Sequence, residues 1–310
     1  MFVIRCNTFA PMPSKVVKAH VAVLAANVFF GINFLVVKYV VPAPLAPITL
    51  NILRVCGALI LFWLLYAIKP NKAGIQLKHI PRFLICAITG VAINQILFIK
   101  GLSLTNTTHA SLLILGTPIA ITFIAAIVLK EKITVLKMIG LGMGIAGATI
   151  LILLKENSKE ASDVITGDIL ILLNAISYAF YLVLARPLMQ EYSAIHVTRW
   201  VFTIGAFMMI PYGWSSFIST DWHAINTIQW GAISMIVICG TFLAYLFNIY
   251  GVKNIGPAAT GAYIYTQPVF ATTLAMIFVG ESYSVLKFLA ALLIFSGVYL
   301  ANFYKPIAVR

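Results

Sequence analysis

Two arginines lie inside long apolar stretches of the sequence, and a buried guanidinium group can bind an anionic group. Arg54 is flanked by TLNIL and VCGAL, and Arg199 lies early in a later apolar stretch. A permanent charge that faces lipid costs several kcal/mol, so Arg54 is expected to face a cavity or a partner rather than the membrane. The basic interior favours a ligand that carries a carboxylate or another anionic group. Snorkelling of the side chain to the headgroups is the alternative.

The acidic residues lie at the ends of the apolar stretches or between them: Glu131, Glu156, Glu160, Asp163, Asp168, Glu191, Asp221 and Glu281. A proton relay of carboxylates deep in the membrane is therefore not expected, and His109 is the histidine closest to the interior of a stretch. Glu131 and Glu281 remain the candidates for coupling at helix ends. The sequence has no G-x-S-x-G or H-E-x-x-H motif, so an enzyme is not expected.

Four cysteines are scattered singly, which suggests neither a metal site nor a disulfide framework, and no cofactor is expected. The composition is that of a membrane protein, with 62% hydrophobic and 9% charged residues and a mean hydropathy of +1.01. An all-α membrane protein with ten transmembrane helices follows, at about residues 16–40, 46–68, 82–101, 109–129, 135–154, 168–188, 195–218, 229–250, 257–279 and 285–304.

The chain repeats itself at an offset of 150 residues. Between the segments 101–137 and 251–287, ten positions are identical, among them Pro118/Pro268 and Glu131/Glu281. Apolar composition alone would give roughly three or four matches. Five spans per copy make the second copy enter the membrane from the opposite side, so a 5+5 inverted-topology repeat is predicted.

The predicted domains are a first repeat over 1–154, with a cytoplasmic tail at 1–15, an external acidic linker over 155–167 and a second repeat over 168–310. In the orientation that places both termini inside, 14 lysines and arginines lie on the inner side and 5 lie on or near the outer side, as the positive-inside rule requires. This bias accounts for the net charge of +13, so nucleic acid is not an expected partner. Met12 is an alternative start to Met1.

The two prolines mark a candidate binding site near the bilayer midplane. Equivalent interrupted helices in inverted repeats are a pointer to the substrate site of a transporter, although a simple kink would also explain Pro118 and Pro268. Other polar residues could line the same cavity or serve as hydrogen bonds between helices. They are Asn27, Asn33, Asn94, Gln95, Asn174, Tyr178, Tyr181 and Asn248, with Tyr265 or Gln267 beside the second proline.

The repeated pattern of Pro, Glu and Gly (Pro118, Glu131, Gly147; Pro268, Glu281, Gly297) resembles the EamA-type repeat of the drug/metabolite transporter superfamily. The segment FFGINFLVVKYV and Arg54 are similar to the family's beginning. The resemblance covers nearly the whole chain. It implies ten helices, cytoplasmic termini, and export of small metabolites such as amino acids across a bacterial cytoplasmic membrane.

The leading hypothesis is a secondary transporter whose partners are the lipid bilayer and a small-molecule substrate, with a homodimer left open. A nucleotide-sugar or sugar-phosphate antiporter is the alternative. It would need several cations for phosphate, and the candidates are Arg54, Lys38, Lys100 and Arg199. An intramembrane enzyme lacks its motifs, and a non-transporting partner subunit would leave the symmetric Pro and Arg positions unexplained.

Overall fold

The computed structural model describes residues 14–41, 43–68, 74–105, 110, 113–153, 163–278 and 284–303, and within these residues it contains helices and no strands. The first half of the chain contains α1 Ser14–Val40, α2 Pro47–Ile68, η1 Leu77–His79, α3 Ile80–Ala87, η2 Ile88–Ala92, α4 Ile93–Leu104, α6 Thr117–Val128 and α7 Val135–Leu153. The second half contains α8 Val164–Glu191, α9 Ala194–Ile218, η3 Trp222–Ala224, α10 Thr227–Val237, η4 Ile238–Leu243, α11 Ala244–Ile255, α12 Pro257–Ala262, η5 Tyr263–Thr266, α13 Gln267–Phe278 and α14 Val285–Phe303.

Six helical stretches are long and apolar enough to cross a membrane: Ser14–Asn33, Pro47–Ile68, Leu77–Leu104, Val164–Glu191, Ala194–Ile218 and Thr227–Ile255. Three shorter apolar helices are Thr117–Val128, Val135–Ile150 and Phe288–Ala301. In hydrocarbon the backbone polar groups must be satisfied within the protein, which makes helices the expected structure. The all-helical, membrane-embedded class predicted from composition is therefore confirmed.

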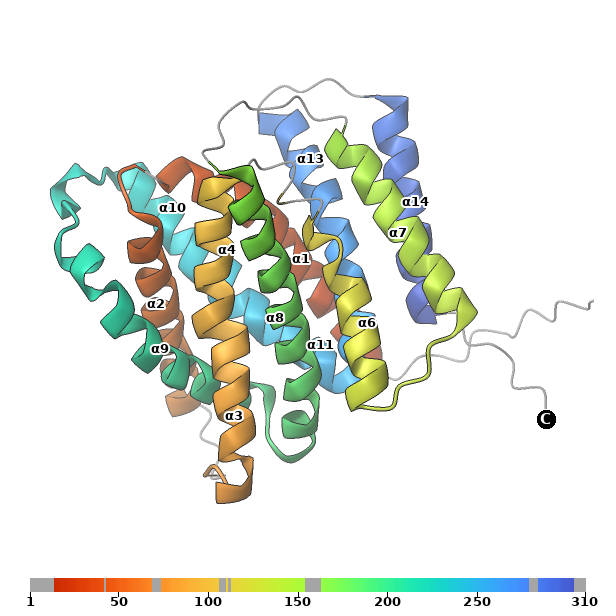
Figure 1. Cartoon of the computed structure of the whole chain (residues 1–310), viewed down its shortest axis with the longest axis horizontal. Coiled ribbons are helices and arrows are strands. Elements are labelled where there is room, and N and C mark those ends of the chain that lie inside the picture. Colours follow the sequence, from red (N-terminus) through yellow and green to blue (C-terminus); the bar gives the residue numbers. More distant parts are fainter. Residues whose placement is uncertain are drawn as a thin grey trace, which may run out of the picture.

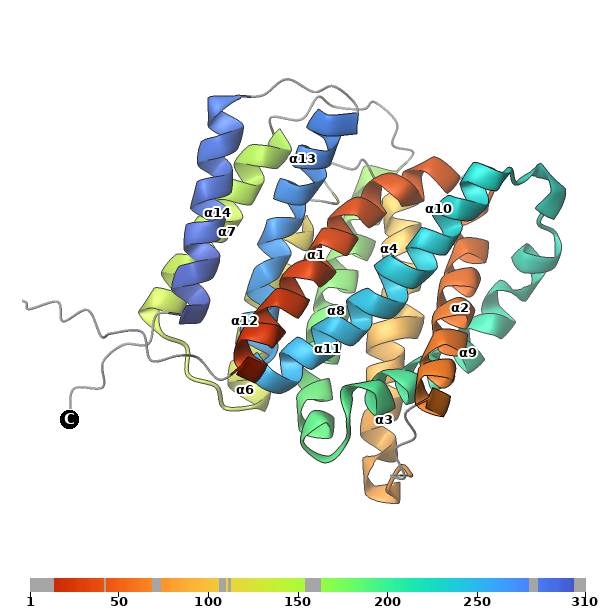
Figure 2. The same ribbon diagram turned by 180° about the vertical axis from the view of Figure 1, so that it is seen from behind.

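Helices from the two halves of the chain pack against each other throughout the molecule. α4 contacts α8 and α11 contacts α1 in the centre, while α2 packs on α9 and α7 packs on α14. Figures 1 and 2 show the α2–α9 pair at one edge and the α7–α14 pair at the opposite edge. Each half therefore contributes helices to both edges and to the middle.

Close backbone contact holds α7 against α14. A Cβ atom added to Gly140 would lie 2.6 Å from the carbonyl oxygen of Gly297, and one added to Gly147 would lie 2.7 Å from that of Ala290. Gly140 and Ala290, like Gly147 and Gly297, are 150 residues apart, so the two contacts are related by the sequence repeat. Glycine at these positions lets the two helix backbones approach each other closely. Gly144 instead accommodates the ring of Tyr265.

The helix that opens the second half begins at a side-chain cap. Asp163 precedes α8, and its carboxylate accepts a hydrogen bond of 3.2 Å from the backbone N–H of Thr166. Such a cap satisfies one of the donors that the first turn leaves free. Hydrogen bonds with the side chain of Thr166 and with its backbone N–H lower the pKa of Asp163. The linker residues 155–162, His109 and Glu281 lie outside the described residues.

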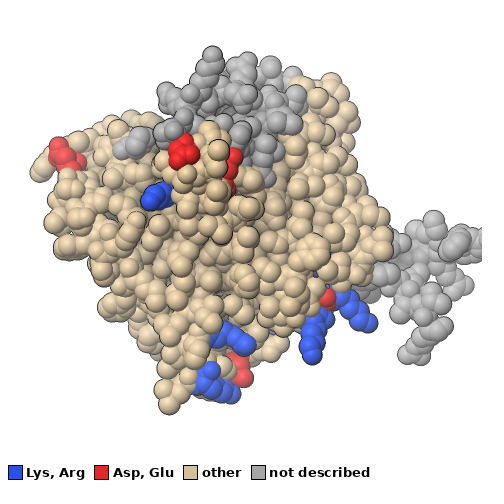
Figure 3. Space-filling view, in the orientation of Figure 1, with Lys and Arg blue, Asp and Glu red and all other residues tan. Residues whose placement is uncertain are grey.

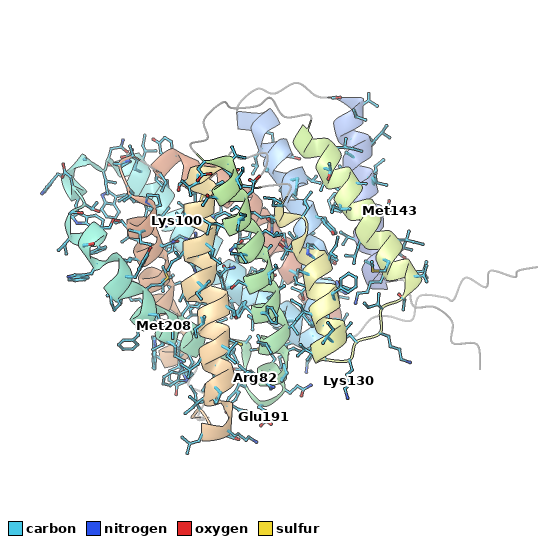
Figure 4. The ribbon with its side chains drawn as sticks, viewed as in Figure 1. Arg82, Lys100, Lys130, Met143, Glu191 and Met208 are labelled. Atoms are coloured by element: carbon cyan, nitrogen blue, oxygen red, sulfur yellow. The ribbon has the colours of Figure 1, made fainter. Side chains whose placement is uncertain are left out.

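Charged side chains gather at the two ends of the helices. Figure 3 shows lysines and arginines mainly at the lower edge, near the lower ends of α3 and α6. In Figure 4, Arg82, Lys130 and Glu191 lie at this lower end, and Lys100 lies at the upper end. The apolar band between them is what a membrane-embedded helical protein requires.

Replacing Gly140 by alanine is expected to destabilise the α7–α14 contact. The new methyl group meets the backbone of α14, so the free energy of unfolding should fall by roughly 1–3 kcal/mol. Gly142 on the same helix has no atom within 4 Å of an added Cβ. Gly142→Ala should leave stability unchanged or raise it by up to about 1 kcal/mol, because alanine favours a helix. Thermal unfolding in detergent compares the two, and equal midpoints would contradict this account of the contact.

Candidate binding cavity

Both proline-containing helices are interrupted directly before the proline. A turn at Leu115–Gly116 precedes α6, in which Pro118 is the second residue, and the 3-10 segment η5 precedes α13, in which Pro268 is the second residue. Proline suits the first turn of a helix, where its missing N–H has no intrahelical partner. The ranges 109–129 and 257–279 are thus broken rather than continuous helices.

Two π-helical segments, which the sequence analysis did not predict, lie at equivalent places in the two halves. They are η2 and η4, which contain Gly90 and Gly240 respectively. Gly90 packs against the ring of Tyr181, and Gly240 packs against the amide of Asn33. Each π-helical segment therefore receives a polar side chain from a long helix of the other half. Such segments occur frequently at functional sites.

Hydroxyl groups satisfy backbone carbonyls in and near the π-helical segments. The Tyr245 hydroxyl donates to the Gly90 carbonyl at 2.9 Å, and the Ser177 hydroxyl donates to the Thr89 carbonyl at 2.8 Å. Thr241 donates to the Ile236 carbonyl at 2.9 Å. The irregular backbone is thereby supported by side chains, as burial in an apolar environment requires.

Arg54 is fixed by one of these hydroxyl groups. Its Nε atom donates to the Thr241 hydroxyl at 3.1 Å, so an arginine of α2 is bonded to η4 of the other half. Arg54 is 5% exposed and lies seven residues after the start of α2, about 10 Å along the helix at 1.5 Å per residue. The charge therefore lies well inside the apolar band, where Arg54 contributes to the lining of a cavity.

The cavity has a volume of about 110 Å³ and lies between the two halves. Its lining comprises Phe30, Asn33, Arg54, Asn94, Gln95, Phe98, Ile114, Thr117, Asn174, Tyr178, Tyr245, Ile264 and Gln267. Within this described lining, Arg54 is the one charged side chain. The cavity therefore combines a single cation with amides, hydroxyls and aromatic rings.

Amide groups around the cavity differ in how they are bonded. Asn94 and Asn174 each donate to the other's backbone carbonyl, at 3.2 and 2.8 Å, and Gln267 donates to the Asn27 side-chain oxygen at 2.8 Å. The side-chain oxygens of Asn33 and Gln95 are buried and have no hydrogen-bond partner among the described residues. The Gln95 Nε2 atom also has no partner among these residues, so two acceptors and one donor remain for a ligand.

Seven of the candidate residues line the cavity: Asn33, Arg54, Asn94, Gln95, Asn174, Tyr178 and Gln267. The others lie elsewhere. Pro118 is buried behind Thr117, and Pro268 follows Gln267. Tyr181 packs on Gly90, and Tyr265 packs on Gly144 rather than facing the cavity.

The Asn248 amide is used within its own helix, where it donates to the Ala244 carbonyl at 3.1 Å. Phe30, Phe98 and Tyr245 line the cavity although the sequence analysis did not select them as site residues. Aromatic residues in apolar helices carry no signal of their own. In the sequence, this region is marked only by a glycine that recurs after 150 residues, at Gly90 and Gly240. The Tyr245 hydroxyl donates its hydrogen bond to the carbonyl of Gly90.

Aromatic rings from both halves pack together next to the cavity residue Tyr245. Phe62 packs against Phe202 and Phe242 with ring centroids 5.1 and 4.7 Å apart, and Phe202 meets Tyr245 at 4.9 Å. Phe62 lies eight residues further along α2 than Arg54, toward the lower end in Figure 1. Phe62 of the first half and Phe202 of the second therefore belong to one buried apolar core.

An ion-pair cluster joins the two halves at the lower end. Glu131, which follows α6, pairs with Arg186 of α8 and lies 3.7 Å from Lys137 of α7. Arg186 and Glu131 thus connect α8 of the second half to the end of α6 in the first. Gly256 lies beside the pair with φ +88, and an added Cβ would be 3.1 Å from the Arg186 Nη1 atom. Glycine is favoured there both by its backbone conformation and by the lack of space.

Arg199 and Arg54 do not form a symmetric pair. Arg54 lines the cavity, whereas Arg199 lies outside the lining and its guanidinium group faces the aromatic rings of Trp63 and Tyr66. Among the described lining residues, the cavity therefore has one guanidinium group from the first half and none from the second.

Proteins of known sequence resemble the chain over most of its length. It is 22% identical over 292 residues to the uncharacterized transporter YetK of Bacillus subtilis, covering 94% of this chain and 88% of the relative. It is 24% identical to the uncharacterized transporter YyaM of the same organism, covering 93% and 94%. A probable terminal-alkyne amino-acid exporter of Streptantibioticus cattleyicolor is 23% identical, covering 76% and 78%.

A solved crystal structure shares the fold with a TM-score of 0.77 at 17% sequence identity, covering 92% of this chain and 96% of the other. The model of the EamA-like transporter family matches twice, over residues 17–153 and 165–303. The two matches account for both copies of the sequence repeat and for the apolar helices. The chain belongs to the EamA-like transporter family.

Proposed function

We propose that this protein is a secondary transporter that exports a small polar metabolite, such as an amino acid, by alternating access. The observation that carries the proposal is the buried Arg54 in the lining of a cavity between two halves. Arg54 supplies a cation for a carboxylate, and the unpaired oxygens of Asn33 and Gln95 supply acceptors for an ammonium group. A zwitterionic solute would satisfy both kinds of group. The amino-acid exporter among the relatives supports this substrate class.

A ten-helix, 5+5 inverted repeat with domains 1–154 and 168–310 is part of the proposal. The paired contacts of α4 with α8 and of α11 with α1 support it, as does the relation between the glycine contacts of α7 and α14. The basic residues at the lower end support a cytoplasmic location for that end and for both termini, in a bacterial inner membrane.

A substrate with several phosphates finds less support. Of the four basic candidates, Arg54 lines the cavity, Lys100 is exposed at the upper end, and Arg199 is enclosed by aromatic rings. The side chain of Lys38 lies outside the described residues. One cation suits a carboxylate better than a nucleotide sugar, and the volume of about 110 Å³ is below the roughly 300–1,000 Å³ of drug-sized pockets.

Counterflow in proteoliposomes tests the substrate class. Vesicles preloaded with an unlabelled amino-acid mixture should accumulate the labelled mixture, and Arg54→Gln should weaken apparent affinity by about 10- to 150-fold, the effect of losing a hydrogen bond to a charged group. Arg82→Gln, which removes a charge at the lower end, should behave as the wild type. Equal transport by Arg54→Gln and wild-type protein would remove Arg54 from the site. Absence of counterflow with active vesicles would remove the amino-acid class.

Thr241→Val tests whether the hydrogen bond to Thr241 positions Arg54 for transport. Valine keeps the shape of threonine but removes the oxygen that accepts from Arg54 Nε, so KM should rise by about 5- to 10-fold, the effect of roughly 1 kcal/mol. Thr241→Ser retains a hydroxyl and should restore most of the affinity. In the Arg54→Gln background, Thr241→Val should have a much smaller effect. Additive effects of the two changes would show that they act separately.

Alternating access requires that the lower ion pair separates when the cavity opens at that end. Arg186→Gln should therefore expose the lower core more often, by about 2- to 5-fold, because a partly exposed ion pair contributes up to about 1 kcal/mol. The measurement is the rate at which an impermeant maleimide labels Ala258→Cys in a protein whose natural cysteines are replaced by serine. Lys132→Gln, at an exposed neighbour of Glu131, serves as the control. An unchanged rate in Arg186→Gln would show that the pair does not hold the lower end closed.

A further inference from the structure

A second buried cation lies at the edge of the molecule, away from the cavity. Arg199 of α9 is 2% exposed, and its guanidinium carbon lies 3.5 Å from the ring centroid of Tyr66 and 4.6 Å from that of Trp63, both on α2. The Trp200 ring lies 5.6 Å away. Aromatic faces stabilise a cation, but they leave the N–H groups at its edge without acceptors.

Four buried polar atoms of this region have no hydrogen-bond partner among the described residues. They are Arg199 Nε and Nη1, His196 Nε2 and Trp200 Nε1. Arg199 Nη2 lies 3.2 Å from His196 Nδ1, and an arginine can only donate, so Nδ1 is the acceptor and Nε2 of the neutral ring carries the hydrogen. All four unpaired atoms are therefore donors. A ligand that satisfies these four donors must carry several hydrogen-bond acceptors, as the oxygen atoms of an oxyanion do.

The position of these donors favours a membrane ligand. Arg199 is five residues from the start of α9, and Trp63 and Tyr66 lie in the last turns of α2, so the group is near the lower end of the α2–α9 pair. Trp63 is 38% exposed and its neighbour Leu64 is 55% exposed. Tryptophan and tyrosine at this depth are typical of the level of the lipid headgroups.

We propose that His196, Arg199 and Trp200 form a binding site for a phosphate oxyanion, supplied by a membrane phospholipid whose acyl chains lie along the α2–α9 pair. Arginine binds phosphate through several directed N–H groups, and basic pockets between membrane helices bind lipid headgroups. The exposed apolar side chains beside the site provide a surface for the acyl chains. Lipid bound there would connect α2 of the first half to α9 of the second.

Thermal unfolding of the purified full-length protein in detergent tests the site. Added dioleoylphosphatidylglycerol should raise the unfolding midpoint by about 2–4 °C. Dioleoylglycerol, which has the same chains and no phosphate, should not raise it. Protection by dioleoylglycerol equal to that by the phospholipid would overturn the role of the phosphate. Equal protection by inorganic phosphate would overturn the lipid as its source, and no protection by any of the three would overturn the site.

Single substitutions test whether the protection by phosphatidylglycerol depends on the residues of the proposed site. Arg199→Gln should lose the protection by phosphatidylglycerol, and the control Arg82→Gln, at another arginine of the lower end, should keep it. Trp200→Phe removes one donor and retains an aromatic ring, so it should reduce the protection even if Arg199→Gln does not fold. Full protection of Arg199→Gln, or of Trp200→Phe where Arg199→Gln cannot be purified, would overturn the assignment.

Discussion

The hydrogen bond from Arg54 to Thr241 joins a buried charge of the first half to an irregular backbone segment of the second, and the cavity depends on it. In an apolar environment a charge without a partner is costly, so Arg54 needs a fixed polar neighbour. Thr241 also bonds to the Ile236 carbonyl, which ties the arginine to η4. The same constraint explains why hydroxyls of Ser177 and Tyr245 bond to carbonyls at η2. Irregular helices and polar side chains therefore occur together here.

The helical class, the family and the proline breaks could be predicted from the sequence, because they follow from apolar length, a repeated pattern and the missing N–H of proline. Seven polar cavity residues, Asn33 and Arg54 among them, were also identifiable, since a polar group deep in an apolar stretch needs a partner. The π-helical segments could not be predicted. An extra residue in a helical turn leaves composition and hydropathy unchanged, and only the repeated Gly90 and Gly240 marked the place.

Contacts between distant parts of the chain set the roles that sequence analysis missed. Arg186 binds Glu131, which lies 55 residues earlier, and Arg199 is enclosed by rings of α2. Neither partner is visible from local spacing. Tyr265 was a candidate for the cavity lining because it precedes Pro268, but its ring packs in the space beside Gly144. Helix type and depth are thus local properties, whereas the direction of a side chain is settled by packing.

The single guanidinium group of the cavity bears on how the two halves differ. Arg54 comes from the first half and bonds to Thr241 of the second, whereas the second half contributes amides, hydroxyls and an apolar side chain to the described lining. A cavity built from two identical halves would contain two such guanidinium groups, and two like charges in an apolar environment would repel each other. The chemical asymmetry of the lining therefore requires two copies that differ in sequence.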